Sequence, residues 1–287
     1  MSKPVNSIAL ICHPAKPAMP KLVKEITTWA QNNNIRLFLT SDIAQKVDRN
    51  DLKTEIKEIS KLAKIIVVLG GDGSILQCAR TFAADNIPIA GINLGHLGFL
   101  TLDERYNAIQ TLNKLKDGNY IVEERMMLKA SVYRNNQEVF SGVALNDVVI
   151  QKEPIMRVIK VKVSICKNLV NSYLGDGLII SGPTGSTAYS LSAGGPIVPP
   201  WVNVMLICPL NSHTLSARPV ITSDKEVIEA QLSCTHSQVD LVLDGQESFR
   251  LQDADEIKVI RSEHVAQIAV LQSRNFFEIL RKKMKWG

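Results

Sequence analysis

The sequence predicts two domains, an N-terminal α/β domain built on a doubly wound parallel sheet and a mostly antiparallel β domain after it. Up to residue 120, short apolar runs alternate with apolar residues at helical spacing, which is typical of repeated strand–helix units. Over 121–267, apolar and polar residues alternate in short runs bounded by turn residues, as in antiparallel strands. The tail 268–287 is apolar and then helical, and we expect it to pack back on the first domain.

The first domain is expected to alternate strands with helices along the chain. The predicted strands cover 8–12, 35–39, 65–69 and 87–92. The predicted helices cover Pro20 to Ala30, Asn50 or Asp51 to Ile59, Ser74 to Phe82, and Tyr106 to Leu115. The unbroken aliphatic run from Ile65 to Leu69 indicates a strand that is buried on both faces, as in a parallel sheet. A turn at Asp117-Gly118-Asn119 closes the domain.

The second domain shows the two-residue alternation of half-buried strands. The clearest examples are the runs from Val158 to Val163 and from Val239 to Leu243. The Asp244-Gly245 pair that follows the second run fits a hairpin turn. In this domain only the segment from Gly185 to Ala193 is expected to be helical.

The composition is that of a globular protein with a small positive charge. The chain has 287 residues, of which 45% are apolar and 21% charged, and its formal net charge is +5. No apolar stretch approaches the ~18 residues of a membrane span, and no signal peptide is predicted. The mild positive balance suits an anionic small molecule and is too weak to indicate nucleic acid. The five scattered cysteines are interpreted as reduced core thiols, so the protein is expected in the cytoplasm.

The segment Gly70-Gly71-Asp72-Gly73-Ser74 directly follows the buried strand. Its glycines let the backbone turn sharply and approach a ligand closely, and Ser74 is expected to cap the next helix. A strand, a glycine turn and a helix N-terminus together favour phosphate binding. Because a carboxylate repels phosphate, Asp72 is expected to hold a metal, bind a hydroxyl or accept a proton. The alternative is a plain tight turn in which Asp72 tolerates unusual backbone angles.

A second glycine-rich region extends from Gly175 to Pro196 and is dense in hydroxyls. Hydroxyls and backbone amides are suited to lining a polar ligand such as a nucleotide, and Tyr189 is placed to stack on a base or pack beneath a ribose. The alternative is a structural loop, with a helix capped by Ser186 or Thr187 and with Tyr189 in the core.

A polar pair, Asn146-Asp147, interrupts the apolar run from Val143 to Ile150. Such a pair costs free energy if it is buried without partners. The Asn146 amide both donates and accepts, as reading an adenine edge requires, and Asp147 could bind two ribose hydroxyls. The alternative is a bulge or a strand end. His213 lies among hydroxyls, where a structural hydrogen bond is favoured over a ligand contact.

Six motifs follow one another along the chain. From the N-terminus they are Gly70-Gly71-Asp72-Gly73-Ser74, Asn93 to Leu100, Leu145-Asn146-Asp147, Asp176 to Pro196, His213 to Pro219, and Leu243-Asp244-Gly245-Gln246. In this order they closely resemble bacterial NAD kinases across nearly the whole chain. The glycine loop alone is a weak signal, because phosphofructokinases and diacylglycerol or sphingosine kinases share a similar loop. The segment from Asp176 to Pro196 is far more specific, and the ordered set makes chance similarity implausible.

The resemblance implies a Rossmann-like first domain and a β-sandwich-like second domain, with NAD bound between them, usually across a subunit contact in a homodimer or homotetramer. It implies a phosphotransferase that moves the γ-phosphoryl group of ATP, or a phosphoryl group of polyphosphate, to the 2′-hydroxyl of the adenosine ribose of NAD. The product is NADP. The implied cofactor is a divalent metal, Mg²⁺ or else Mn²⁺, and no side chain is assigned as its direct ligand. Neither nucleic acid nor a membrane is an implied partner.

The resemblance also assigns site residues position by position. Asp72 is the implied proton acceptor for the ribose hydroxyl, and the phosphate cradle around it consists of Gly70, Gly71, Gly73 and Ser74. The implied NAD contacts are Asn146, Thr184 and Thr187 at the adenine, Asp147 at a ribose, Tyr189 beside the adenosine, and Asp176 at the nicotinamide end. Further implied NAD contacts are Asp72, Gly73, Phe99, Arg157, Leu174, Ala188, Ser190, Leu191, Ser192, His213 and Gln246.

Two positions depart from the family pattern. Gly182 stands where the family usually has Thr, and Leu174 stands where related enzymes often carry Arg or His near the substrate. A lost charge at Leu174 could alter the preference between NAD and NADH. Two alternatives are a lipid kinase and a non-catalytic nucleotide sensor. The polar Asn146-Asp147 pair argues against the apolar acceptor pocket of the first, and the retained Asp72 argues against the second.

Overall fold

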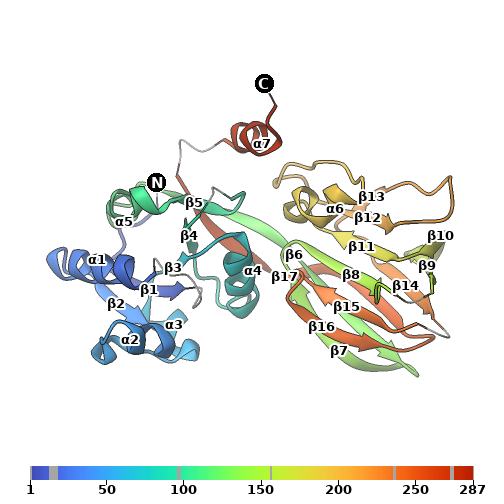
Figure 1. The fold of residues 1–287 in the computed structure, drawn as a ribbon, viewed down its shortest axis with the longest axis horizontal. Helices are drawn as coiled ribbons and strands as arrows, with labels where there is room; N and C mark the ends of the chain where they lie inside the picture. The colour runs from blue at the N-terminus through green and yellow to red at the C-terminus, as the bar shows by residue number, and fades with distance from the viewer. Residues whose placement is uncertain are drawn as a thin grey trace. The chain divides into compact units, whose positions relative to one another are not determined.

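The computed structural model of the chain describes residues 2–12, 19–95, 98–155, 157–234, 237–271 and 275–286 (Figure 1). The chain forms two compact units. Unit 1 consists of Met1–Glu124 together with Ala266–Gly287, and unit 2 consists of Arg125–Val265. The C-terminal segment therefore belongs to the first unit, as predicted.

The sheet of unit 1 is parallel. Its strands are β1 (Ser7–Cys12), β2 (Arg36–Leu39), β3 (Ile65–Leu69), β4 (Ile89–Asn93) and β5 (Thr101–Glu104), in the spatial order β2-β1-β3-β4-β5. The end of β17 (Glu256–Val270) also lies in this unit, where Ile268 pairs in parallel with Ile89. Every residue of β3 and β4 is buried, as expected for central parallel strands that are covered on both faces.

Helices cover both faces of this sheet, which confirms the predicted doubly wound domain. They are the α-helices α1 (Met19–Asn32), α2 (Ser41–Lys46), α3 (Ile56–Leu62), α4 (Asp72–Thr81) and α5 (Ala108–Lys116), with the short 3₁₀ helices η1 (Asn50–Leu52) and η2 (Arg105–Asn107). The C-terminal segment adds α7 (Phe276–Met284). Figure 1 shows α1 and α5 on one side of the sheet and α2 and α3 on the other. The Trp29 Nε1 atom of α1 donates to Asn113 Oδ1 of α5 at 2.9 Å, so these two helices pack side by side.

The single helix predicted from residue 50 to 59 is wrong, because the chain divides there into η1 and α3. Lys53 adopts an extended backbone (φ −62°, ψ 133°), and the Thr54 N–H donates to the Leu39 carbonyl oxygen of β2 at 2.8 Å. This pairing with the sheet ends the first helical turn. Ile56 is 52% exposed instead of lying on a buried stripe. The periodicity also missed α2 and β5, which are only 6 and 4 residues long.

Unit 2 consists of two antiparallel sheets. The first contains β10 (Asn168–Gly175), β9 (Ile159–Ile165), β14 (Ile228–Ser233), β17, β6 (Ile121–Arg134) and β7 (Gln137–Ala144) in this spatial order. The second contains β13 (Val220–Ser223), β12 (Val204–Leu210), β11 (Gly177–Ser181), β8 (Asp147–Lys152), β15 (Val239–Leu243) and β16 (Glu247–Leu251). The predicted alternation therefore marks real strands.

The core of unit 2 lies between these two sheets, as in a β-sandwich. Leu128 and Val161 of the first sheet and Ile150 and Ile180 of the second belong to one buried cluster. A smaller cluster covers the opposite face of the second sheet. Its residues Val149 and Ile179 alternate along their strands with the core residues Ile150 and Ile180, so their side chains point to the other face of the sheet. Val198 packs on them from the segment that contains η3 (Thr184–Thr187) and α6 (Tyr189–Ser192).

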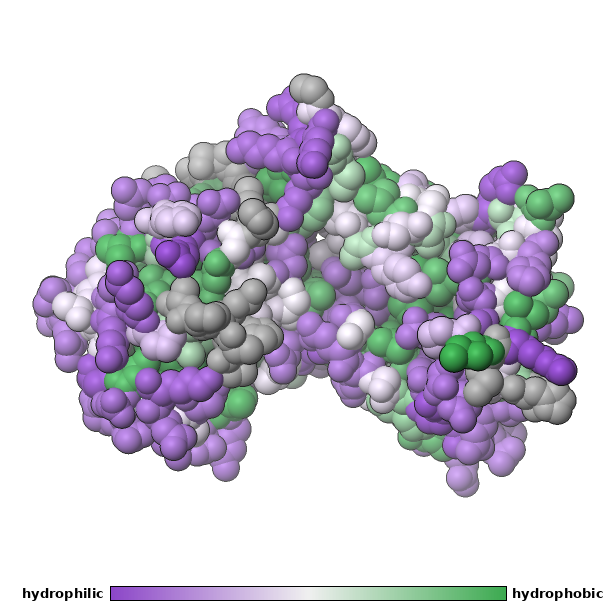
Figure 2. Space-filling model, viewed as in Figure 1, coloured by the Kyte–Doolittle hydropathy of each residue, from purple (hydrophilic) through white to green (hydrophobic). Residues whose placement is uncertain are grey.

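The surface and the cysteines agree with most of the compositional expectations. Figure 2 shows that hydrophilic side chains cover much of the visible face of each unit. None of the helices in the described ranges is long and apolar enough to cross a membrane. Cys12, Cys78, Cys208 and Cys234 are buried free thiols, as predicted. Cys166 is exposed instead, because it lies in the β9–β10 turn, where its φ of 47° serves chain reversal and not core packing.

Candidate functional site

The Asp72 carboxylate joins two of the predicted motifs within unit 1. Strand β3 ends at Leu69, and α4 begins at Asp72 immediately after the glycines. Asp72 Oδ2 accepts the Phe99 N–H at 2.8 Å, and Oδ1 accepts the Leu100 N–H at 3.0 Å. The carboxylate therefore accepts hydrogen bonds from the backbone of the 98–100 segment, a contact that sequence reasoning did not anticipate. Each oxygen keeps a second lone pair for another donor.

Gly98 is required at this contact because it leaves room for the carboxylate. A Cβ atom built on Gly98 would lie 2.0 Å from Asp72 Oδ1. The Gly98 N–H donates to Thr101 Oγ1 at 2.9 Å, which fixes the turn before β5. The position of the Asp72 side chain therefore depends on the backbone of residues 98–100, and on glycine at position 98.

Ser74 does not cap α4 as predicted. The helix starts two residues earlier, its N-cap position is Gly71, and no side chain caps it. The Ser74 N–H instead donates to the Gly71 carbonyl oxygen at 3.0 Å. Ser74 lines a small hollow of about 250 Å³ together with Cys12, Thr40 and Gln77. Ser74 therefore does not have the capping role that the sequence predicted for it.

The C-terminal helix packs against the segment that Asp72 holds. The ring centroids of Phe99 and Phe276 are 6.5 Å apart, and the Lys283 ammonium lies 6.0 Å from the Phe99 ring centroid. Phe99 is half-buried. This contact confirms that the tail packs back on the first domain.

Asp147 is buried at the first position of β8, so the strand-end alternative describes the local structure correctly. Its exposed fraction is 4%, and its partner in β11 is Ser181. Burial first, and then the neighbouring Asp244 carboxylate, raise the pKa of Asp147 to about 7. A buried carboxyl with such a pKa is typical of functional sites.

Asn146 lies where three backbone segments meet in unit 2. Its carbonyl oxygen accepts the Gly182 N–H at 3.0 Å and the Ser181 hydroxyl at 3.2 Å. A Cβ atom on Gly185 would lie 2.1 Å from this oxygen, so only glycine allows the η3 turn to approach. The structure therefore brings Asn146 and Asp147 next to the turn that contains Thr184.

Asp244 holds this pair in place and is the residue that sequence reasoning missed. Its carboxylate accepts the N–H groups of Leu145 (3.0 Å), Asn146 (2.7 Å) and Asp147 (3.2 Å). The predicted hairpin turn is present, with φ of 52° at Asp244 and 66° at Gly245. An Asp-Gly pair between two strands predicts such a turn, but nothing in the sequence indicates what the side chain contacts.

The region from Gly175 to Pro196 is not one ligand-lining loop. Its residues 177–181 form the fully buried strand β11, which separates Asp176 from Thr184. Asp176 forms an ion pair with Lys152 at 3.2 Å and accepts the Asn211 Nδ2–H at 2.8 Å. The Asn211 hydrogen bond and then Lys152 lower the pKa of Asp176.

The other predicted contacts in unit 2 fall at one or the other end of β11. The exposed His213 donates its N–H to the Leu174 carbonyl oxygen at 2.9 Å and lies near Asp176. Arg157 is also exposed and lies in the loop after β8. Because β8 pairs antiparallel with β11, the Lys152 end of β8 lies beside Asp176. Gln246 lies at the opposite end, in the β15–β16 turn. The structure therefore does not gather all the predicted residues at one point.

Helix α6 presents Tyr189 outward and Ser190 inward. Tyr189 is 45% exposed, so it is not in the core. The Ser190 hydroxyl is fully buried and lies 3.2 Å from Cys208 Sγ. Neither Ser186 nor Thr187 caps a helix, since the residues before η3 and α6 are Pro183 and Ala188. Ala188, Leu191 and Ser192 surround Tyr189 in sequence and are half-buried or exposed.

The Gly182 departure has a simple packing consequence. A Cβ atom there would lie 3.3 Å from the terminal methyl of Met126, which is the flexible end of a side chain. A larger residue at this position therefore requires only a small shift of Met126. The other departure, Leu174, is 41% exposed on β10.

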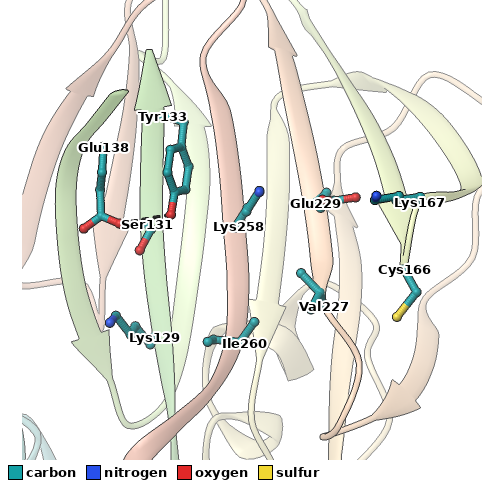
Figure 3. A pocket seen from close by; sticks show the side chains of 10 residues that line it. All are labelled: Lys129, Ser131, Tyr133, Glu138, Cys166, Lys167, Val227, Glu229, Lys258 and Ile260. Carbon is teal, nitrogen blue, oxygen red and sulfur yellow. Dashed lines mark hydrogen bonds between the residues drawn. The ribbon is translucent and has the colours of Figure 1, made fainter. Parts of the chain in front are cut away.

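A hollow of about 500 Å³ lies on the outer face of the first sheet of unit 2 (Figure 3). Side chains of β6, β7, β14 and β17 and of the Cys166-Lys167 turn surround it, and Tyr133 donates to Glu138 at 3.0 Å. Its lining includes none of the predicted site residues. The motifs that meet at Asp72 in unit 1, and those that meet at Asp147 in unit 2, mark the candidate site residues better than the size of this hollow does.

Comparison with known proteins identifies relatives of both units. The profile of the ATP-NAD kinase N-terminal domain matches residues 8–120, and that of the ATP-NAD kinase C-terminal domain matches residues 145–271. The NAD kinase of Natranaerobius thermophilus is 39% identical over 283 residues, which are 99% of each chain. The NAD kinase of Geobacter metallireducens is 39% identical over 286 residues, again 99% of each chain.

Two solved structures share the fold. A yeast NADH kinase complexed with NADH has a TM-score of 0.88 and 22% identity, and the match covers 99% of this chain and 88% of the other. An NAD kinase from Archaeoglobus fulgidus in complex with ATP has a TM-score of 0.77 and 24% identity, with 97% and 98% covered. These likenesses support the two-domain α/β plus β-sandwich architecture.

Proposed function

The chain belongs to the ATP-NAD kinase family, and we propose that it transfers the γ-phosphoryl group of ATP to the 2′-hydroxyl of the adenosine ribose of NAD. The chain is an enzyme of the phosphotransferase class, and its product is NADP. The observation that carries the assignment of roles is the position of Asp72. Its carboxylate lies at the N-terminus of α4, directly after the glycine turn, and is fixed to the 98–100 backbone.

The glycine turn and the start of α4 are proposed to receive the phosphates of the donor. The helix is 10 residues long, and its N-terminal N–H groups and dipole favour an anion. A Cβ atom on Gly71 would meet no atom within 4 Å, so the space beside the turn is open. Gly70, Gly73 and Ser74 complete the segment. Positioning and neutralisation of charge at this turn would supply most of the rate gain in a phosphoryl transfer.

Asp72 is proposed to orient the acceptor hydroxyl and to take its proton. In the transfer, the ribose oxygen forms a bond to the γ-phosphorus while the bond to the leaving ADP oxygen breaks. The hydroxyl proton passes to the Asp72 carboxylate. The two backbone N–H groups at 2.8 and 3.0 Å hold the carboxylate before substrate arrives, so little reorganisation is needed.

Unit 2 is proposed to bind NAD along β11. Asn146, Thr184 and Thr187 would bind the adenine, Asp147 a ribose, and Tyr189 the adenosine face, while Asp176, Arg157, Leu174 and His213 serve the nicotinamide end. Five residues of β11 separate the two groups, which is about 16 Å at the usual rise per strand residue. An extended dinucleotide suits two separate groups better than a compact ligand does. Phe99, Ala188, Ser190, Leu191, Ser192 and Gln246 are proposed as further contacts or supports.

The divalent metal is proposed to enter with the triphosphate. Within the described ranges, no three His, Cys, Asp or Glu side chains gather closely enough to hold an ion. Mg²⁺ is commonly bound through substrate phosphates and few side chains, so the described residues fit a metal that arrives on ATP. Mg²⁺ is the first choice and Mn²⁺ the second. We further propose that the protein is cytoplasmic and that it forms a homodimer or homotetramer. Light scattering would test the oligomeric state.

The first experiment is mass spectrometry of purified protein incubated with NAD, ATP and Mg²⁺. We expect an NADP mass from the wild type. Asp72→Asn should lower turnover about a thousandfold, the scale of a lost proton acceptor in a positioned site, while calorimetry still shows NAD binding. Near-normal turnover by folded Asp72→Asn would remove Asp72 from this role. NAD binding without any product would favour a nucleotide sensor, and polyphosphate would then be tested as donor.

A further inference from the structure

We propose that Asp244 is a positioning residue for NAD binding, whose carboxylate fills a nest of three consecutive backbone N–H groups and so orients Asn146 and Asp147 toward the ligand. The inference rests on the proposed function for the identity of the ligand. It assigns Asp244 a role that the hairpin-turn motif alone does not carry.

The geometry of the nest is specific to a carboxylate at this place. The N–H groups of Leu145, Asn146 and Asp147 all donate to Asp244, at 3.0, 2.7 and 3.2 Å. Three successive N–H groups that converge on one anion are a recognised arrangement for binding negative charge. Here the anion is supplied by the chain itself. The Asp244 N–H also donates to the Asp147 carbonyl oxygen at 3.0 Å, so the two segments are tied in both directions.

The turn places the carboxylate where solvent cannot replace it. Asp244 is only 8% exposed, and its φ of 52° aims the side chain back over the end of β8. Loss of the carboxylate would leave three backbone donors in a largely buried place without their acceptor, which is costly. The loop from Leu145 to Asp147 would then relax toward other partners, and Asn146 and Asp147 would lose their orientation.

Asp244 is placed to act on NAD through Asp147 and not by direct contact. Its two oxygens are directed at the 145–147 backbone, whereas the Asp147 side chain lies on the face of the second sheet that η3 and α6 cover. Its charge also contributes to the raised pKa of Asp147, after burial. A substitution should therefore change NAD affinity and its pH dependence, and leave the phosphate turn at Asp72 unaffected.

The test compares Asp244→Asn with Asp240→Asn by calorimetry with NAD in the absence of ATP. Asn keeps the size and tolerates positive φ, but it replaces one acceptor oxygen with a donor. We expect the NAD dissociation constant to rise about tenfold in Asp244→Asn, as for one or two lost hydrogen bonds. Asp240→Asn removes a carboxylate of β15, the strand that precedes the Asp244 turn, and this carboxylate pairs with Arg250 on the surface. This control variant should leave the constant unchanged.

Two further readouts separate positioning from mere stability. In Asp244→Asn the KM for NAD should rise while kcat and the KM for ATP stay within about twofold of the wild type, and the apparent pKa of NAD binding should fall. A folded variant with an unchanged NAD constant and pH profile overturns the proposal. Hydrogen exchange on the wild type needs no variant: rapid exchange of the Leu145, Asn146 and Asp147 amides in the folded protein would also overturn it. Because binding is measured without ATP, a failure of phosphoryl transfer is distinguishable from a failure of this proposal.

Discussion

Two aspartates, one in each unit, occupy opposite surroundings. The Asp72 carboxylate accepts two backbone N–H groups and is partly exposed. The Asp147 carboxylate is 4% exposed and has another carboxylate, Asp244, as its neighbour. The Asp72 carboxylate therefore has its hydrogen-bond donors before any ligand binds, whereas the surroundings of Asp147 disfavour its charged form. Hydrogen-bond donors from a bound substrate would remove this disadvantage, which agrees with the proposed roles of Asp72 in phosphoryl transfer and of Asp147 in NAD binding.

After the loss expected for Asp72→Asn, the next largest effect comes from a change that disturbs the position of the Asp72 carboxylate and leaves its chemistry intact. In Gly98→Ala the new methyl group would lie 2.0 Å from Asp72 Oδ1 and must displace it. We expect turnover to fall about a hundredfold, since a misplacement of about 1 Å has effects of this size. Steady-state kinetics would measure it. In the same loop, a Cβ on Gly95 has its nearest neighbour at 3.7 Å, so Gly95→Ala is the matched control. Equal rates for both variants would contradict the contact.

The second effect removes the unfavourable charge at Asp147. Because the pKa of Asp147 is raised from 3.8 to about 7, the folded state binds its proton more tightly than the unfolded chain does. Stability from this group is present below pH 3.8 and is lost as the pH rises through 7. Asp147→Asn should therefore stabilise the free protein at pH 8, by at most about 4 kcal/mol, and change it little at pH 4. Denaturant unfolding at both pH values measures this, and destabilisation at pH 8 would count against the burial argument.

The same substitution should have the opposite effect on ligand binding. If Asp147 accepts ribose hydroxyls as a carboxylate, NAD binding favours the charged form and releases a proton near neutral pH. The dissociation constant should then fall roughly tenfold between pH 6 and pH 8, in proportion to the ionised fraction. Calorimetry in buffers of different ionisation enthalpy would detect the proton. Asp147→Asn should weaken binding and abolish the pH dependence; a pH-independent wild type would refute this assignment.

The smallest effect concerns Tyr189, whose proposed contact with NAD involves neither of the two aspartates. Its ring is 45% exposed on α6, so an adenosine face could cover it. We expect Tyr189→Phe to bind NAD as the wild type does, and Tyr189→Ala to bind roughly five- to tenfold more weakly, as for a lost stacking contact. Equal losses in the two variants would assign the effect to the hydroxyl.

The elements that follow local rules could be predicted from the sequence. The run from Ile65 to Leu69 is a strand buried on both faces, and the Asp244-Gly245 pair is a hairpin turn. Their signals lie within a few neighbouring residues, as hydrophobic periodicity and turn chemistry do. The order of motifs along the chain identified the family for the same reason.

The contacts that depend on chain segments far apart could not be predicted. Asp72 meets Phe99 and Leu100 across 27 and 28 residues of sequence, and Asp244 meets Asn146 across 98. No local pattern records such a pairing. The same limit explains why a single helix was wrongly predicted across residue 53. A β-bridge between Lys53 and Leu39 interrupts the helix there, although the apolar residues keep helical spacing. Side chains that organise a backbone at a distance are thus invisible to periodicity, even in a motif that is recognised.

The position of Cys166 makes the protein suitable for single-site labelling. It is the exposed member of the five cysteines, at the β9–β10 turn, and the other four thiols are buried. Burial raises the pKa of Cys208 and Cys234, which lowers their fraction of reactive thiolate. A maleimide dye should therefore attach to Cys166 alone in the folded protein. Fluorescence anisotropy of that dye would report the rotational size of the protein, and so its oligomeric state, without any engineered cysteine.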